Sequence, residues 1–392
     1  MKTNILKPLK KNSFFKSFLI LGLSLLFLPG LYGQKPDYQL QILNKNKDGV
    51  TCLDFSPDGE NILFGSGDRK AKIWDYQDNK ILWEADLPRE IYSVKYLPNG
   101  KFFFVNGGNQ ILIYDSIGQY VNTLKGHATA IWSMDTDPEG RFLISGCFAK
   151  TFRLWDISEV KLLFQNSQHS KSVLSVCFNS MGTKFASGSL DKSIKIWSWP
   201  ERILLHSFAA HSENIYDLEF NSAVKILASA SRDKNIKLWD VETGELTRIL
   251  KGHTESVFCL SFSPNGHFLI SGAATGNIKL WEVATGRCIH TYIGHDGPVS
   301  SIHFHPDGSS FASGSYDETI RIWELSPELI VNFCCPSELE SEISSNKVFL
   351  PKGENESKSE YKIRLQKQEE IKKQLVNKYY QKYLARLNSM QL

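Results

Sequence analysis

Residues 253–282 of this chain read HTESVFCLSFSPNGHFLISGAATGNIKLWE, and residues 295–324 read HDGPVSSIHFHPDGSSFASGSYDETIRIWE. The two stretches align without a gap at a distance of 42 residues, and both begin with His and end with Trp-Glu. Such agreement indicates an internal repeat. A period of about 40 residues is typical of folds built from repeated small sheets.

The same pattern occurs seven times along the chain. An aromatic residue marks the end of each copy, at steps of 40 to 42 residues: Trp74, Tyr114, Trp155, Trp197, Trp239, Trp281 and Trp323. A histidine marks the start of five copies, at steps of 42 residues: His127, His169, His211, His253 and His295. The sequence therefore predicts seven equivalent structural units between about residue 50 and residue 324.

Turn signals divide each repeat into four short runs rich in β-forming residues. In one repeat these runs are 257–262, 267–271, 277–282 and 287–293. We predict that each repeat forms a four-stranded antiparallel sheet. Because one such sheet cannot bury both of its faces, each must pack against its neighbours, and the series must close into a ring.

The Trp-Asp and Trp-Glu ends, the Gly-His starts and the seven in-phase copies resemble the WD-repeat family. The resemblance covers residues 34–330 and implies an all-β fold, a seven-bladed β-propeller of four-stranded antiparallel blades. In that family the first and last segments share one blade. Residues 38–44 alternate between apolar and polar side chains, while Ser326-Pro327 interrupts the last repeat. We therefore predict that this N-terminal strand closes the ring.

The resemblance also implies a hydrogen-bonded chain of Asp, His, Ser and Trp within a blade. Three repeats carry the whole set: His169, Ser187, Asp191 and Trp197; His211, Ser229, Asp233 and Trp239; and His295, Ser313, Asp317 and Trp323. Two repeats lack the acid and carry Ala149 or Thr275 in its place. An active site needs one nucleophile beside one base, so three evenly spaced copies favour a structural role.

Searches for catalytic and metal-binding motifs give no candidate. No zinc-protease, phosphate-loop, nucleophile-elbow or dinucleotide-binding motif occurs in the required context. His303 and His305 lie two residues apart, but no acidic residue or cysteine beside them completes a metal site. We see no acidic cluster at repeat-equivalent positions. We therefore predict no enzymatic activity, no metal and no cofactor. A propeller enzyme or a glycan-binding module remains the alternative.

In WD-repeat proteins the common docking surface is the face of the ring that bears the Gly-His loops. Its contacts come from the residue after the first apolar position of the innermost strand, and from the residue before the tight-turn Asp. These positions predict a binding site for a protein or peptide partner that contains Tyr92, Trp132, Phe148, Leu174, Tyr216, Arg232, Phe258 and Tyr316. Aromatic residues and arginine are enriched at interface hot spots. The alternative is that some of these side chains fill the core between blades.

The charge distribution argues against nucleic acid as a partner. The formal net charge of +3 falls to −2 once the five lysines of residues 1–33 are left out. A near-neutral body lacks the basic surface on which binding to phosphate depends.

Residues 1–33 contain the three parts of a secretory signal. A lysine-rich start precedes an apolar stretch at 18–28 and the helix-breaking pair Pro29-Gly30. The apolar stretch is shorter than the ~20 residues that span a bilayer. We predict cleavage near Gly33, export to the periplasm or the medium, and no membrane span after processing. The alternative is an N-terminal membrane anchor.

Beyond the repeats, residues 331–354 contain prolines and no strong periodicity, so they are predicted to form a linker. Residues 355–392 contain no Gly or Pro, and the pattern from Ser357 to Glu360 is typical of a capping box. Apolar residues recur every four positions at Ile371, Leu375, Tyr379, Tyr383 and Leu387. This stripe predicts one amphipathic helix. It can pack on the propeller, self-associate or bind a partner, or lie on an anionic membrane.

Overall fold

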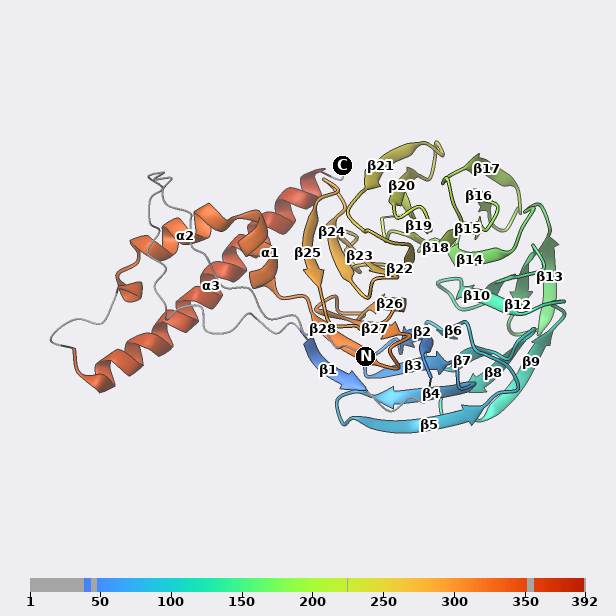
Figure 1. The fold of residues 1–392 in the computed structure, drawn as a ribbon, viewed down its shortest axis with the longest axis horizontal. Helices are drawn as coiled ribbons and strands as arrows, with labels where there is room; N and C mark the ends of the chain where they lie inside the picture. The colour runs from blue at the N-terminus through green and yellow to red at the C-terminus, as the bar shows by residue number, and fades with distance from the viewer. Residues whose placement is uncertain (1–38, 44–47, 224, 351–355, 391–392) are drawn as a thin grey trace, which may run out of the picture. The chain divides into compact units, whose positions relative to one another are not determined.

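The computed structural model describes residues 39–43, 48–223, 225–350 and 356–390. The signal sequence expected over residues 1–33 lies outside these residues. The described strands form seven sheets of four antiparallel strands each, arranged around a ring (Figure 1). The seven-bladed propeller expected from the repeats is confirmed.

The first three blades contain β2 (Val50–Phe55), β3 (Asn61–Ser66), β4 (Lys70–Asp75) and β5 (Lys80–Asp86); β6 (Val94–Tyr96), β7 (Phe102–Asn106), β8 (Gln110–Asp115) and β9 (Tyr120–Lys125); and β10 (Ile131–Thr136), β11 (Phe142–Cys147), β12 (Phe152–Asp156) and β13 (Lys161–Asn166). The next three contain β14 (Val173–Phe178), β15 (Lys184–Ser189), β16 (Ser193–Ser198) and β17 (Leu204–Ala209); β18 (Ile215–Phe220), β19 (Ile226–Ser231), β20 (Ile236–Asp240) and β21 (Leu246–Leu250); and β22 (Val257–Phe262), β23 (Phe268–Ala273), β24 (Ile278–Glu282) and β25 (Cys288–Tyr292). The seventh contains β26 (Val299–Phe304), β27 (Ser310–Ser315), β28 (Ile320–Glu324) and β1 (Gln39–Leu43).

The seventh blade joins the two ends of the repeat region. Strand β1 pairs antiparallel with β28, so that Leu43 lies opposite Ile320 and Gln41 opposite Ile322. Leu43 is 1% exposed and belongs to the apolar core between blades seven and one. The closure predicted for the N-terminal strand is therefore confirmed.

The core of the ring lies between neighbouring blades. The apolar clusters combine residues of adjacent sheets, as where Trp239 of blade five packs with Phe220 and with Ile194 of blade four. In blade one, Phe64 stands where blades three to seven carry the network serine, and it is fully buried. Leu87, at the histidine position of blade two, is buried as well. Blades one and two thus replace the polar network with apolar packing.

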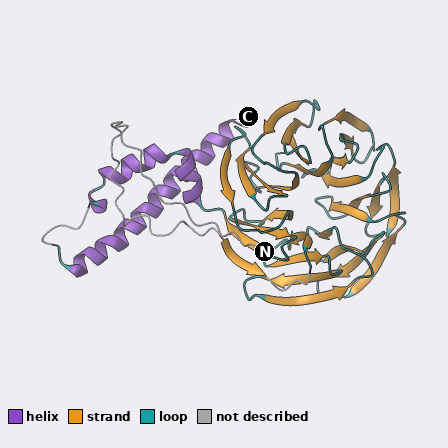
Figure 2. Ribbon diagram, in the orientation of Figure 1, coloured by secondary structure: helices purple, strands orange, loops and turns teal. Residues whose placement is uncertain are grey.

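Two short helices follow the last blade, the first beginning just before the segment 331–354 that was expected to be an irregular linker and the second lying within it (Figure 2). They are α1 (Pro327–Cys334) and α2 (Pro336–Ser345), followed by the 3-10 turn η1 (Lys347–Phe349). Each helix begins at a proline, because the fixed φ of proline suits the first helical position and its missing N–H is not needed there. Ser326 caps α1 by accepting a hydrogen bond from the Leu329 amide at 3.2 Å. The expectation that these prolines mark loops is therefore wrong: each occupies the first turn of a helix.

The predicted C-terminal helix is present as α3 (Lys358–Met390). Its capping box is formed, because the Ser357 amide donates to Glu360 at 2.9 Å and the Glu360 amide donates to the Ser357 hydroxyl at 3.2 Å. Among the described residues, no helix is both long enough and apolar enough to span a membrane.

The apolar stripe of α3 is covered within the chain. Tyr383 and Leu387 pack into the core between blades six and seven, and the Tyr383 hydroxyl donates to the buried Glu282 carboxylate. Leu375 and Tyr379 pack against residues of α1 and α2. The sequence left three roles open for this stripe: packing on the propeller, self-association or partner binding, and attachment to a membrane. These contacts correspond to the first of the three.

Candidate functional site

A β-bulge recurs at the start of the innermost strand in six blades. The pairing register shifts at Thr51, Trp132, Leu174, Tyr216, Phe258 and Ser300. A bulge leaves its extra residue out of the ladder and redirects its side chain. In blade two the strand begins later, at Val94, and Tyr92 precedes it. In all seven blades the residue at this position lines the central cavity of the ring.

Tyr92, Trp132 and Phe148 form a compact group that we call the aromatic cluster. The rings of Tyr92 and Trp132 stack with centroids 4.4 Å apart and an interplanar angle of 20°. Phe148 meets Trp132 edge-on at 5.1 Å and is 38% exposed. Stacked and edge-on pairs hold the rings in fixed positions. The cluster is thus a preformed apolar surface on blades two and three.

The other predicted contact residues differ in accessibility. Tyr216 and Phe258 form an edge-on pair at 5.0 Å, and Tyr316 is 51% exposed. Leu174 is only 4% exposed, so it fills the core between blades, as the alternative interpretation allowed. Arg232 is exposed on blade five.

These side chains meet at one cavity in the centre of the ring. It has a volume of about 630 Å³, and Tyr92, Trp132, Leu174, Tyr216, Phe258 and Tyr316 all line it. Phe148 contacts Trp132 but does not itself line the cavity, and neither does Arg232. The structure therefore brings six of the eight predicted residues to one cavity and places Phe148 against one of them.

Acidic side chains occur on the innermost strands at the central cavity, a feature that we did not predict from the sequence: Asp135, Asp217 and Glu219 line the cavity together with Lys95, whereas Asp54 does not. Asp54, Asp135 and Glu219 occupy equivalent positions in blades one, three and five, and Asp217 lies close by in blade five. Each of the four carboxylates accepts a backbone N–H of the next blade at 2.8 Å. Our prediction of no acidic cluster at equivalent positions was wrong. The main role of these carboxylates is to tie adjacent blades together.

Some acidic residues at the cavity are paired with a lysine, and others are not. Lys95 lies 3.2 Å from Asp135 and 3.9 Å from Asp54, and these carboxylates outweigh the effect of burial and raise the pKa of Lys95. Blade five has no comparable ion pair among the described residues. Burial raises the pKa of Asp217 to about 6, and burial together with Asp217 raises the pKa of Glu219 well above its usual range. The wall of blade five is therefore unfavourable for a further negative charge.

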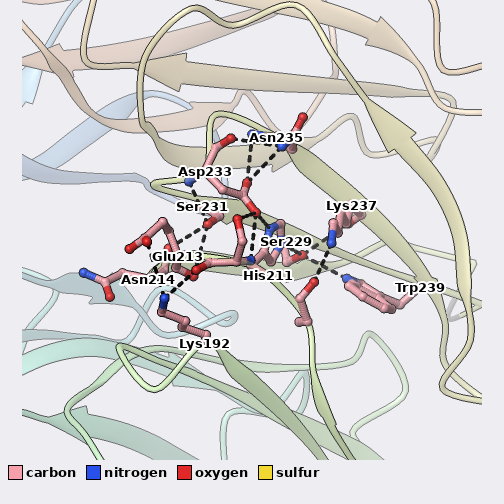
Figure 3. Close-up of polar contacts among 12 residues, drawn as sticks. Lys192, His211, Glu213, Asn214, Ser229, Ser231, Asp233, Asn235, Lys237 and Trp239 are labelled. Carbon is pink, nitrogen blue, oxygen red and sulfur yellow. Dashed lines mark hydrogen bonds and ion pairs between the residues drawn. The ribbon is translucent and has the colours of Figure 1, made fainter.

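The three predicted networks are formed. In blade five His211 Nδ1 lies 2.9 Å from Asp233 Oδ2, His211 Nε2 lies 2.7 Å from Ser229 Oγ, and the Trp239 indole donates to Ser229 at 2.9 Å (Figure 3). The corresponding contacts in blade four (His169, Ser187, Asp191, Trp197) and blade seven (His295, Ser313, Asp317, Trp323) lie between 2.7 and 3.4 Å. The histidines are buried in blade interfaces, so these are structural networks.

Blade three shows what the missing carboxylate changes. His127 Nε2 lies 2.6 Å from Ser145, but His127 Nδ1 is buried without a hydrogen-bond partner in the described part of the chain. Burial and the nearby Arg153 lower the pKa of His127 to about 3. In blade six, which has Thr275 at the acid position, burial and Lys279 lower the pKa of His253 to about 4. Both imidazoles are neutral in the folded chain at pH 7.

The two histidines considered for a metal site face different surroundings. His303 lines the central cavity and lies 3.5 Å from Asp54, whereas His305 lies 3.1 Å from the Gly59 carbonyl at the contact with blade one. No group of three or more metal-ligating side chains occurs within the residues that the structure describes.

A known family of repeat domains matches six of the seven repeats. The family described as WD domain, G-beta repeat matches residues 38–75, 118–156, 160–198, 202–240, 244–282 and 286–324, which make up more than half of the chain. The chain belongs to the WD-repeat family. Each WD repeat begins in the outer strand of one blade and ends in the third strand of the next, as residues 38–75 run from β1 to β4. The unmatched stretch falls on blade two, where Tyr114 replaces the usual Trp.

Individual relatives match only part of this WD-repeat chain. THO complex subunit 3 of Arabidopsis thaliana is 27% identical over 133 residues, which are 33% of this chain and 42% of the relative. Transcription factor unc-37 of Caenorhabditis elegans and the protein groucho of Drosophila melanogaster are each 28% identical over 131 residues. These residues are 33% of this chain but 21% and 18% of the two relatives. The match thus spans less than half of each relative.

Proposed function

We propose that this WD-repeat protein is a non-enzymatic scaffold that binds a protein or peptide partner on its Gly-His loop face, with the aromatic cluster at the centre of the contact. The observation that carries the proposal is the series of large side chains at β-bulge positions that line one cavity. A contiguous exposed apolar surface on a folded domain usually marks an interaction site.

The composition of the mouth supports a protein partner. Trp, Tyr and Arg carry most of the binding energy in protein interfaces, and Tyr92, Trp132 and Tyr216 are all present here. The relatives include a subunit of a complex and a transcription factor by name, which fits a role in assembly rather than catalysis.

The proposal predicts that replacing both Trp132 and Tyr216 with Ala removes partner binding. Loss of a hot-spot pair should weaken the complex by ~2 kcal/mol or more, which is about 30-fold in affinity. The measurement is affinity capture from the native envelope fraction, followed by titration of the captured partner against wild type and variant. Circular dichroism checks that the ring is intact.

Tyr120→Ala is the matched control. Tyr120 is an exposed aromatic residue on the outer strand β9, away from the cavity mouth, and its loss should leave the affinity unchanged. Retention of the same partner at the same affinity by the double variant would place the binding site elsewhere. Binding of sugars on a glycan array that depends on Trp132 would assign the face to a glycan instead.

We also propose that the protein is exported, with residues 1–33 as a cleaved signal, on the strength of the lysine-rich start and short apolar stretch. The mass of the protein purified from its own host tests this. We expect a mature N-terminus near Gln34, and an intact Met1 on cytosolic protein would contradict export.

A further inference from the structure

A second hollow of about 610 Å³ adjoins the central cavity on the Gly-His loop face, between blades one, two and three. We call it the basic groove. Its walls are formed by Arg69, Pro88, Arg89, Glu90, Tyr92, Gly108, Asn109 and residues 128–130. Tyr92 also lines the central cavity and belongs to the aromatic cluster. The groove is therefore continuous with the surface that we propose for partner binding.

The two arginines of the groove are available for a ligand. Neither the Arg69 nor the Arg89 guanidinium makes a hydrogen bond or ion pair with the residues that the structure describes, and both side chains are exposed. Glu90 also faces the groove, but it accepts a hydrogen bond from the Tyr92 hydroxyl. Two guanidinium groups against one engaged carboxylate leave the groove with a positive charge.

The glycine at position 108 determines where the side chain of Arg89 can lie. Gly108 has a φ of +78°, and a Cβ atom at this position would lie 2.8 Å from Arg89 Cγ. The glycine thus leaves room for the Arg89 stem to lie across the turn between β7 and β8. This contact limits the directions that the guanidinium can take, and a side chain held in place loses less entropy when it binds.

The central cavity and the groove have opposite electrostatic preferences. Asp135, Asp217 and Glu219 line the cavity, where Lys95 is paired with Asp135 at 3.2 Å, and the two arginines line the groove. A partner carboxylate finds no unpaired cation among these buried acids, whereas in the groove it can accept hydrogen bonds from a guanidinium. The apolar aromatic cluster lies between the two.

We propose that the partner is a linear acidic peptide, in which an Asp or Glu side chain binds Arg69 and Arg89 while a neighbouring apolar side chain packs on the aromatic cluster. This inference rests on the proposed function and specifies the chemistry of its partner. An acidic peptide is chosen because its carboxylate complements the two arginines. Its apolar side chain is placed on the aromatic cluster because Tyr92 joins the cluster to the groove.

The test uses the full mature chain and a displayed library of random peptides of about 12 residues with blocked C-termini. We expect the selected peptides to contain an Asp or Glu near an aromatic or aliphatic residue. Replacing that acid with its amide, or Arg69 and Arg89 together with Ala, should weaken binding about tenfold, because a charge-assisted hydrogen bond is lost. The losses of affinity caused by the peptide change and by the arginine substitutions should not add, since each change removes the same contact.

Replacing Lys171 and Lys251 together with Ala is the matched control, because both are exposed cations beside the histidine loops of blades four and six and line neither the groove nor the central cavity. An equal loss of affinity in this variant would show general charge attraction and overturn the inference. Selected peptides whose binding depends on Trp132 but that show no preference for Asp or Glu would overturn the inference of an acidic partner and leave the proposed function intact. Selection of no peptide that depends on Trp132 would overturn both.

Discussion

Deletion of residues 36–47 is expected to abolish the single cooperative unfolding transition of the chain. The deletion removes β1, leaves the β28 edge unpaired and takes the buried Leu43 out of the core between blades seven and one. Burial of one leucine and its ladder hydrogen bonds contributes several kcal/mol. In a ring the loss also frees both end blades, because each blade is stable only when both neighbours are in place. Thermal and urea unfolding followed by circular dichroism measure the effect.

A synthetic peptide of residues 36–47 provides the control for this deletion. Added in excess to the truncated chain, it should restore the cooperative transition, whereas a peptide of scrambled sequence should not. A truncated chain with an unchanged melting curve would show that β1 does not close the ring.

Ser229→Ala should lower the free energy of unfolding by about 3 kcal/mol. The Ser229 hydroxyl is the contact of both His211 and the Trp239 indole, and all three side chains are buried. Removing it leaves two buried polar groups without a partner, each at a cost of about 1–3 kcal/mol. Urea titration measures the loss. Ser158→Ala, at an exposed turn, should change stability by less than about 0.5 kcal/mol. An equal effect of both variants would contradict the structural role of the network.

In blade three, a substitution that completes the same network should raise the free energy of unfolding instead of lowering it. Ala149→Asp places a carboxylate at the position equivalent to Asp191, beside the unpartnered Nδ1 of His127. We expect a gain of about 1 kcal/mol at pH 7. In the wild type His127 stays neutral down to a pKa of about 3, while the unfolded side chain takes up a proton near pH 6.5. Stability therefore falls as the pH drops below 6.5, and Ala149→Asp should reduce that fall by raising the pKa of His127.

The ring could be predicted from the sequence because its signal is repeated. Seven copies at a constant step define the blades, and the interrupted end of the last copy indicates where the N-terminal strand must pair. The three complete networks could be predicted for the same reason, and so could the cavity-mouth positions from Tyr92 to Tyr316. The capping box of α3 depends on Ser357 and Glu360 alone and could be identified locally.

Features that occur once, or in few of the copies, were harder to predict. The acidic residues of the innermost strands were missed because only blades one, three and five have an acid at this position (Asp54, Asp135 and Glu219), while the other blades have different side chains there. Leu174 could not be distinguished from its aromatic counterparts, since the sequence does not show that its smaller side chain lies within the core. The linker was assigned from its prolines, although Pro327 and Pro336 both occupy positions where proline begins a helix.

The pairing of β1 with β28 also fixes the order of events during synthesis. The ribosome makes Leu43 early and its partner Ile320 only after six blades have been translated. Until then the growing polypeptide is an open arc whose first inner strand, with Val50 and Leu53, has no neighbour from blade seven. Any product that terminates before Glu324 remains such an arc, with an apolar surface that chaperones and proteases recognise. The ring can therefore close only after the last repeat has been translated.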